Sequence, residues 1–302
     1  MKEYAPRIRI QAESGYTLAR EALHLCFYVH RPYRDLASAA LRALELYLGS
    51  VEPQALGLYA SPEGEWQTLD EAGWEFTRSQ LLDEAGGIIQ LRDASSDNRY
   101  SFDCLGKSID EPALRSRPDA VCAVRFGLPM GYLEENGPER VRALALQLAS
   151  TLSPSSGHAG LAIHGDLDLI GVMQRVTPYC FRHPGLDLLP LEHVSWELGS
   201  RVRGPAWLTF LGQPALGGLG GIEGLRGQLH SPGTTVEALG EGSAVITLGT
   251  WPEAGDTEQG HTLPAYRELA RVLEPWRFHE EHPYSLGFTP EQLLRWERRF
   301  LD

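Results

Sequence analysis

Two β-hairpins can be identified directly from the alternation of apolar and polar residues. In the first, alternating segments at 89–92 and 100–104 flank the turn Asp93-Ala-Ser-Ser-Asp-Asn98. In the second, residues 235–239 and 244–248 flank a short turn at 240–243 that contains two glycines. Strands joined by such short connections pair in antiparallel fashion. The sequence therefore disfavours a doubly wound parallel sheet, in which strands and helices alternate strictly.

The remaining chain contains apolar patterns of both periods, 3.6 residues for helices and 2 for strands. The patterns predict helices at 36–48, 69–82, from 136 onward, at 222–229 and from 264 to before Pro275, with a less regular helical segment at 167–175. Thr289-Pro-Glu-Gln292 is typical of a capping box at the start of a last helix. Further strands are predicted at 23–30, 55–60, 121–126, 160–163 and 207–211. We expect an α+β fold in which mixed or antiparallel sheet hairpins pack with several amphipathic helices.

The length of 302 residues suits either two average domains or one large one. There is no long linker and no repeat of 20–50 residues. We therefore predict a single domain over residues 1–302, and the best candidate hinge is Thr151-Leu-Ser-Pro-Ser-Ser-Gly157.

The charge balance limits the classes of partner. The chain has 40 acidic and 27 basic residues, a net charge of −13, and its lysines are Lys2 and Lys107. Because phosphate binding needs clustered Lys and Arg, direct binding to nucleic acid is not expected. An acidic chain is better suited to a basic protein partner.

Compartment and membrane signals point to a soluble cytoplasmic protein. The four cysteines form no Cys-x-x-Cys pair, and the N-terminal residues contain no apolar segment of a secretory signal. The uncharged stretch Gly204 to Ile222 has the length of a membrane span but contains six glycines and two prolines. We interpret it as a buried strand followed by a glycine loop.

Motifs for cofactor binding are incomplete. Gly106-Lys107-Ser108 resembles the end of a phosphate-binding loop, but Ser101 stands where that loop needs its first glycine. The glycine run at 217–224 places Glu223 where a dinucleotide-binding turn needs a third glycine. His279-Glu-Glu-His282 lacks the i, i+4 histidine spacing of a zinc protease. We expect no cofactor.

The first long strand carries side chains that could bind a metal. His24, Cys26 and His30 share one face of this strand, and His24 and Cys26 could reach one ion. No third ligand can be identified from spacing. A partly solvated strand face is the preferred interpretation, and no metal is predicted.

One group of side chains leaves a catalytic alternative open. His164, Asp166 and Asp168 bring an imidazole and two carboxylates close together in sequence. Such a set can support acid–base chemistry or hold Mg²⁺. The same residues are ordinary turn and cap residues after a strand, so we predict no catalytic residues.

Several segments of the C-terminal half resemble one known family. They are Pro184-Gly-Leu-Asp187, Ser195-Trp-Glu-Leu-Gly199, Gly204-Pro-Ala-Trp-Leu-Thr-Phe-Leu-Gly212, Leu219-Gly-Gly221, Leu225-Arg226, Gly255-Asp256 and Leu263-Pro-Ala-Tyr-Arg267. These segments resemble the type VI immunity family, a bacterial group formerly catalogued as a domain of unknown function and linked to immunity against VRR-Nuc nuclease toxins. The resemblance covers most of the chain and is most specific at Trp207–Gly212. Pro205-Ala206 departs from the family, which commonly has a polar residue before the tryptophan.

The matching residues are of structural types. Core and turn roles are expected for Ser195, Trp196, Gly199, Trp207, Leu208, Thr209, Phe210, Gly220, Gly221 and Pro264. The resemblance therefore indicates the fold directly and the partner only by inference.

The resemblance implies a non-enzymatic immunity protein that binds a cognate bacterial toxin, a nuclease, and neutralises it by occlusion. The acidic loops 93–97 and 253–258 are the candidate contacts, because loops and turns are expected to be exposed, with Asp93, Asp97, Glu253, Asp256 and Glu258 as the predicted partner-binding residues. Two alternatives stay open: an enzyme centred on His164, Asp166 and Asp168, and a non-catalytic adaptor of a secretion or defence system.

Overall fold

A computed structural model describes residues 5–240, 242–282 and 286–302. The strands are β1 Arg9–Gln11, β2 Thr17–Val29, β3 Leu58–Ala60, β4 Trp66–Thr68, β5 Ile88–Arg92, β6 Ser101–Leu105, β7 Cys122–Pro129, β8 Ser156–Gly165, β9 Leu208–Leu211, β10 Thr234–Ala238 and β11 Ala244–Leu248. The helices are α1 Ala37–Leu48, α2 Glu71–Leu81, α3 Met130–Leu152, α4 Val172–Arg182, α5 Leu191–Glu197, α6 Ala215–Gly218, α7 Gly221–Arg226, α8 Pro264–Leu273 and α9 Pro290–Glu297.

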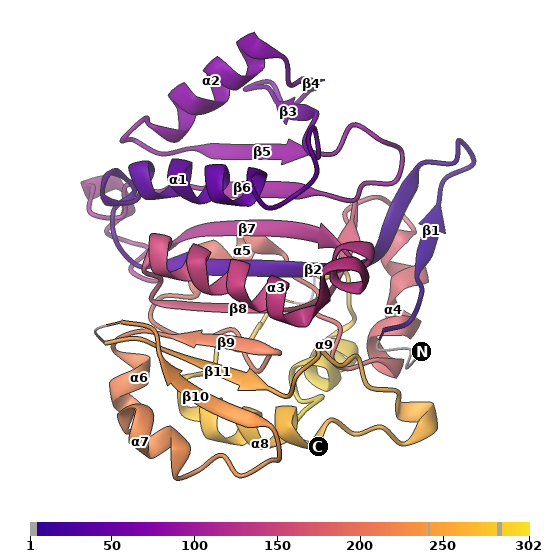
Figure 1. Cartoon of the computed structure of the whole chain (residues 1–302), viewed down its shortest axis with the longest axis vertical. Helices are drawn as coiled ribbons and strands as arrows, with labels where there is room; N and C mark the ends of the chain where they lie inside the picture. Colours follow the sequence, from indigo (N-terminus) through magenta and orange to yellow (C-terminus); the bar gives the residue numbers. More distant parts are fainter. Residues whose placement is uncertain (1–4, 241, 283–285) are drawn as a thin grey trace.

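All the strands belong to one eleven-stranded sheet (Figure 1). Its order is β10-β11-β9-β8-β2-β7-β6-β5-β3-β4, and β1 pairs with β2 outside this path. The pairings between these strands are antiparallel. Both predicted hairpins are present, as β5–β6 and β10–β11. The α+β prediction is confirmed.

The central strand β2 differs from its prediction as a half-buried strand. Its odd-numbered residues, such as Leu25 and Phe27, belong to the main core, which α1 and α3 cover on one face of the sheet. Its even-numbered residues are buried as well, because Cys26 and Tyr28 pack with α5 and with Phe278 in a second core on the other face. The alternation of residues in β2 therefore reflects two different buried cores, one on each face of the sheet, and not one buried face and one solvent-exposed face.

Two helices begin at other residues than predicted. The helix expected from residue 136 is preceded by a helical segment from Met130, and Gly137, with a φ of 78°, separates this segment from the helix that follows Pro138. The helix expected at 167–175 lies further on, as α4, because Gly171 has a φ of 85° and starts the helix there. Ile170, just before it, is fully exposed.

The C-terminal strands β9, β11 and β10 form the other end of the sheet, with α6, α7 and α8 around their own apolar core. The uncharged stretch from Gly204 to Ile222 supplies β9 and the short helix α6 to this region. The capping box at Thr289 is formed as predicted, with both hydrogen bonds to Gln292. Among the helices in the described ranges, none combines the length and the hydrophobicity that a transmembrane span requires.

The predicted hinge at 151–157 is a short connection between α3 and β8. Ser153 adopts a left-handed conformation that ends α3, and β8 begins at Ser156. Strand β8 then pairs with β2 on one side and with β9 on the other.

Candidate functional site

One end of the sheet carries a concentration of negative charge. Residues 45–84, which include β3, β4 and α2, contain nine acidic residues and one basic residue, Arg78. All nine acidic side chains are exposed: Glu45, Glu52, Glu63, Glu65, Asp70, Glu71, Glu75, Asp83 and Glu84. Within the described part of the chain, Glu52 is the member of this set that forms an ion pair, with Arg99 at 3.1 Å. We call residues 45–84 the acidic end; it lies at the top of Figure 1.

A groove of about 640 Å³ lies between α1 and α2 within the acidic end. Its lining includes apolar side chains of Leu48, Leu56 and Trp74 together with the carboxylates of Glu71 and Glu75. Glu71 and Glu75 are four residues apart on α2, where like charges repel each other and destabilise the helix slightly. Glu71 also lies in the first turn of α2, where a carboxylate is favourable, so the repulsion is one of two opposing effects on the helix. The groove combines apolar side chains with carboxylates.

Exposed apolar side chains gather in the same part of the chain. Of the seven large apolar residues that the described ranges leave exposed, four lie between residues 46 and 88: Leu46, Trp66, Leu82 and Ile88. Trp66 is on β4, the edge strand, and the guanidinium of Arg92 lies 4.3 Å from its ring centre. Apolar surface bordered by charged groups is typical of protein interaction sites.

The acidic end was missed in the sequence because charge was considered over the whole chain and at two loops. Counting charges in a window of forty residues would have revealed it. The net charge of −13 is concentrated in this segment, and the rest of the chain is much closer to neutral.

In the predicted contact loop 93–97, most side-chain hydrogen bonds are formed within the turn itself or with Arg99. Asp93 is buried, and its carboxylate accepts hydrogen bonds from the backbone N–H and hydroxyl of Ser95 and from Arg99. Asp97 is exposed. The expectation that both carboxylates lie at the surface is wrong for Asp93, because a tight turn needs an acceptor for its own N–H groups.

The predicted contact loop 253–258 shows the same division. Asp256 is buried, accepts a hydrogen bond from the backbone N–H of Glu258 and pairs with Arg182 at 2.8 Å. Glu258 is exposed and also pairs with Arg182, at 2.9 Å, while Glu253 is exposed. Exposure was expected for Asp256 too, and this expectation is wrong because the carboxylate caps its own turn.

The three side chains of the catalytic alternative differ in burial and in their partners. His164 is buried, with His24 and Asn98 each at 3.2 Å from one of its ring nitrogens. Burial, aided by nearby arginines, lowers the pKa of His164 well below its usual value. Asp166 pairs with Arg92 at 2.7 Å, and Asp168 is exposed. Neutral His164 and the two carboxylates thus have separate surroundings.

The strand face considered for a metal is likewise divided. The His24 ring faces His164, while Cys26 belongs to the core beside α5. Burial raises the pKa of the Cys26 thiol far above its usual value. His30 lies beyond the end of β2, where its Nε2 is 3.1 Å from the carbonyl oxygen of Pro118.

The Ser195–Gly199 motif fixes α5 around a buried lysine. The ammonium of Lys107 donates hydrogen bonds to Ser195 Oγ at 2.6 Å and to the Val121 carbonyl at 3.0 Å. It also lies 4.6 Å from the ring centre of Trp196. Burial lowers the pKa of Lys107 to about 8. Gly199 has a φ of 57°, and a Cβ there would lie 2.4 Å from a carboxylate oxygen, so a side chain is excluded.

The other motif residues lie in the core and at helix starts. Trp207 lies just before β9, is buried, and donates a hydrogen bond from Nε1 to the Gly249 carbonyl at 3.2 Å. In β9, Leu208, Thr209 and Phe210 are also buried. Gly220 and Gly221 have φ values of 85° and 67° at the start of α7, and Pro264 is in the first turn of α8.

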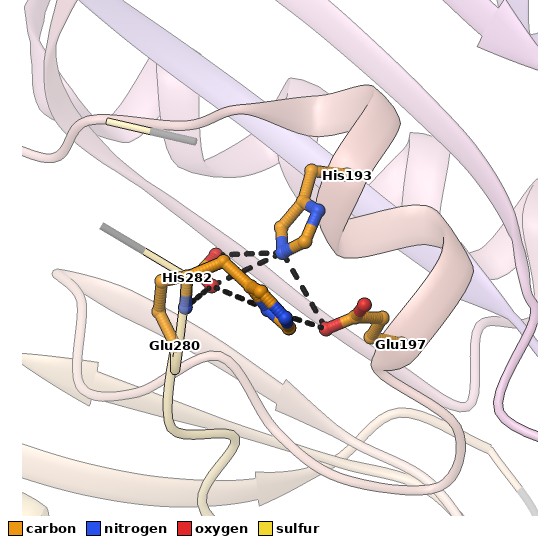
Figure 2. Close-up of side chains that lie close together, drawn as sticks. All are labelled: His193, Glu197, Glu280 and His282. Carbon is orange, nitrogen blue, oxygen red and sulfur yellow. Dashed lines mark hydrogen bonds and ion pairs between the residues drawn. The ribbon is translucent and has the colours of Figure 1, made fainter. Parts of the chain in front are cut away.

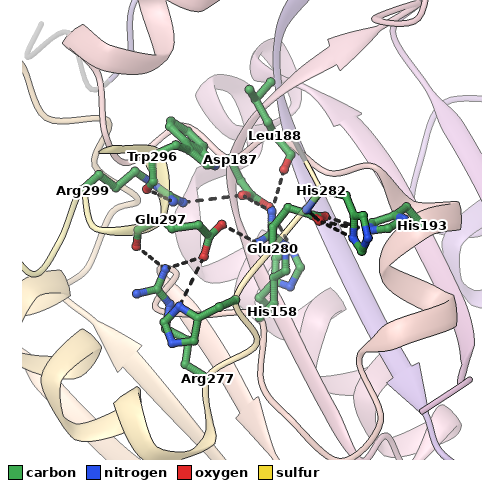
Figure 3. A network of polar contacts seen from close by, with 12 residues as sticks. His158, Asp187, Leu188, His193, Arg277, Glu280, His282, Trp296, Glu297 and Arg299 are labelled. Carbon is green, nitrogen blue, oxygen red and sulfur yellow. Dashed lines mark hydrogen bonds and ion pairs between the residues drawn. The ribbon is translucent and has the colours of Figure 1, made fainter. Parts of the chain in front are cut away.

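One group of charged side chains in the C-terminal half is largely buried and paired (Figure 3). Arg277 and Glu297 are 3.0 Å apart, and Arg203 lies 3.8 Å from Glu297 and 3.7 Å from Asp187. Arg299 lies 3.7 Å from the same oxygen of Asp187, Oδ1, and stacks on Trp296. Burial by itself raises the pKa of Asp187, but Arg203 and His158 outweigh it and hold the pKa well below the usual value. We call this set the buried ionic network.

The cavity beside this network is small. Its volume is about 20 Å³, and its lining includes His158, Asp187, Arg203 and Arg299. This is room for roughly one water molecule. The network therefore links segments of the fold and does not enclose a substrate pocket.

One further cluster has the composition of a metal site. His193 and Glu197 of α5 meet Glu280 and His282 of the segment after α8, with one ligand atom from each within 4.8 Å of the others (Figure 2). In the sequence, the histidine nearest to His282 is His279, three residues away, and this spacing does not indicate a metal site. The i, i+4 pair His193 and Glu197 is the sequence signal that could have indicated one.

Comparison with known proteins identifies the family. A family model described as type VI immunity for VRR-NUC (TsiV) matches residues 39–300, and no curated protein matches the sequence. A solved structure, the Pseudomonas aeruginosa T6SS protein PA0821, has a similar fold with a TM-score of 0.78 at 20% sequence identity, over 99% of this chain and 88% of that chain. Because the family model spans most of the sequence, this chain belongs to the family of type VI immunity proteins for VRR-NUC.

Proposed function

We propose that this chain neutralises its cognate VRR-NUC toxin by covering the toxin's basic nucleic-acid-binding surface with the acidic end. The observation that carries this proposal is the set of nine exposed carboxylates, with a single arginine among them, at one end of the sheet. A nuclease has to present Lys and Arg around its cleft in order to hold phosphates. An acidic protein surface competes for those same residues.

Charge complementarity also favours rapid capture of the toxin. Opposite potentials raise association rates, and this matters for an inhibitor that has to act before DNA is cut. Because Glu52 alone of the nine forms an ion pair within the described residues, the other carboxylates do not have to break an ion pair among these residues on binding.

The apolar part of the acidic end supplies affinity. Tight interfaces depend on a few anchors, often Trp, that fill pockets and exclude water. Trp74 is half-buried in the lining of the groove, and the exposed ring of Trp66 lies on the edge strand. We infer that these rings contact the toxin and that the surrounding carboxylates orient it.

We infer further that the chain acts in the cytoplasm by binding alone. The separate surroundings of His164, Asp166 and Asp168 support a non-catalytic role over the enzyme alternative. The family assignment supports a toxin partner over a general adaptor. Asp97, Glu253 and Glu258 remain predicted contacts of secondary rank, since each is exposed.

Co-expression with the VRR-NUC toxin encoded nearby tests the proposal. Wild type should restore growth, and the double reversal Glu71→Lys with Glu75→Lys should not. The comparison variant, Glu253→Lys with Glu258→Lys, changes the same number of charges at two contacts of secondary rank and should weaken protection less. Protection lost only in this loop variant would move the interface away from the acidic end. Growth arrest unrelieved by wild type would refute toxin neutralisation itself.

A further inference from the structure

Four side chains with metal-binding atoms converge beside α5 (Figure 2). His193 and Glu197 are four residues apart on this helix, so both point from one face of it. Glu280 and His282 are two residues apart in the segment after α8, which places both on one side of an extended chain. The two pairs are separated by more than eighty residues and meet only through the fold.

Separations between the candidate ligand atoms match those of a small coordination sphere. His193 Nε2 lies 3.0 Å from Glu280 and 3.4 Å from Glu197 Oε2. His282 Nδ1 lies 3.7 Å from both Glu197 Oε2 and Glu280 Oε1. Tetrahedral zinc with bonds of about 2.0–2.1 Å requires ligand atoms roughly 3.3–3.4 Å apart. Only small side-chain shifts are needed to reach that geometry.

Glu280 supplies an independent sign that a cation belongs in the cluster. Its side chain is 1% exposed. Oε1 accepts a hydrogen bond from the His282 backbone N–H at 2.7 Å, whereas Oε2 is buried and receives no hydrogen bond from any residue that the structure describes. His193 Nε2 is 3.0 Å from both oxygens, but one ring N–H can be donated to only one of them. Burial of a carboxylate oxygen that accepts no hydrogen bond is unfavourable unless a nearby cation compensates its charge.

We propose that His193, Glu197, Glu280 and His282 bind one Zn²⁺ ion. Two imidazole nitrogens and two carboxylate oxygens form a donor set that suits zinc. Four protein ligands fill a tetrahedral shell and leave no position for substrate, so the site is structural. The ion joins α5 to the segment that carries Phe278, and both belong to the core on the second face of the sheet.

Metal binding is measured on the full-length chain, without an affinity tag, after treatment with a chelator. Zn²⁺ is titrated in competition with a chromophoric chelator, and bound zinc is counted by elemental analysis after gel filtration. One Zn²⁺ per chain is expected. Co²⁺ in its place should give the visible absorption of a tetrahedral site. Glu280→Gln and His193→Gln should each weaken zinc binding by at least about 100-fold, because each removes one of four ligands.

The matched control is Glu281→Gln, which changes the exposed neighbour of Glu280 and should bind zinc like wild type. If Glu280→Gln does not fold, Glu197→Gln replaces it, since the Glu197 side chain is 35% exposed. Wild-type protein that takes up no zinc at micromolar concentrations would overturn the proposal. Unchanged affinity in the folded ligand variants would overturn it equally. Neither outcome bears on toxin neutralisation.

Discussion

At the β4 end of the sheet, charged side chains are exposed and mostly lack an ion-pair partner among the described residues, whereas the buried ionic network of the C-terminal half is shielded from water and paired. The acidic end has nine exposed carboxylates, and one of them forms an ion pair within the described residues. In the buried ionic network, Arg277 and Glu297 are each at most 5% exposed and lie 3.0 Å apart.

This difference separates two uses of charge. Charges in the buried ionic network have lost their water and rely on one another, so removing one leaves another uncompensated. Charges at the acidic end keep their water and contribute little to stability. They are available to a partner of opposite charge. Changes in the first region should therefore affect folding, and changes in the second should affect binding.

The largest effect is expected from Glu297→Gln. This change leaves Arg277 and Arg203 without their shared carboxylate, and loss of one partner of a buried pair typically costs about 3–5 kcal/mol. Chemical denaturation measures the loss. Glu291→Gln, at an exposed position on α9, should change stability by less than about 1 kcal/mol. If both changes lower the unfolding free energy equally, the buried arginines do not depend on the Glu297 carboxylate for their stability.

Lys107 sharpens the comparison, because it is buried but forms no ion pair with any described residue. Its pKa is about 8 in the folded chain, compared with about 10.4 when unfolded. Between these values the unfolded chain holds the proton and the folded chain does not. The contribution of Lys107 to the unfolding free energy should therefore rise with pH, by at most about 1.4 kcal/mol per pH unit.

Unfolding of wild type and Lys107→Met is compared from pH 7 to 10. The stability of wild type relative to the variant should increase above pH 8. Titration of buried groups that do not interact with Lys107 is common to both proteins and cancels in this difference, whereas the Cys104 and Cys122 thiols, whose pKa values Lys107 lowers, still contribute to it. A difference that stays constant with pH would show that Lys107 keeps an ordinary pKa.

Trp74→Ala tests whether the groove contributes affinity. Loss of an aromatic anchor at an interface typically costs about 2 kcal/mol or more, which is roughly a 30-fold weaker dissociation constant. Isothermal titration calorimetry with the toxin measures it. Leu294→Ala removes an apolar side chain that is 62% exposed on α9, and toxin affinity should remain unchanged. Equal affinity of Trp74→Ala and wild type would exclude the groove from the interface.

The smallest effect is expected in association kinetics. Glu63 and Glu65 lie in the exposed turn between β3 and β4. Neutralising both to Gln should lower the association rate several-fold at low salt and make its salt dependence shallower, because exposed charges mainly steer the encounter. Stopped-flow mixing over a range of salt concentrations measures both quantities. If the association rate of wild type does not depend on salt, electrostatic steering is not part of the mechanism. The proposed contacts of the groove with the toxin would be unaffected by that result.

The sequence predicted the parts of this protein that depend on local pattern. Apolar alternation located both hairpins, helical spacing located α1, and the Thr289 cap located α9. The segment around Trp207 indicated the family, and it forms a buried strand in the structure. Positions of helix starts were less accurate where a glycine decided them, as at Gly137 and Gly171.

Long-range partners could not be predicted from pattern. Whether a carboxylate faces solvent or its own turn, as at Asp93, depends on hydrogen bonds that the residue type does not specify. Lys107 reaches Ser195 across 88 positions, and Glu280 meets His193 across 87.

Local periodicity therefore determined which segments become strands and helices, since each residue's neighbours on a helix or strand are set by its place in the chain. Only the tertiary structure decided which charges are buried together and which remain exposed, because burial depends on what the fold places on top of each side chain. The acidic end and the buried ionic network are separated by that physical distinction.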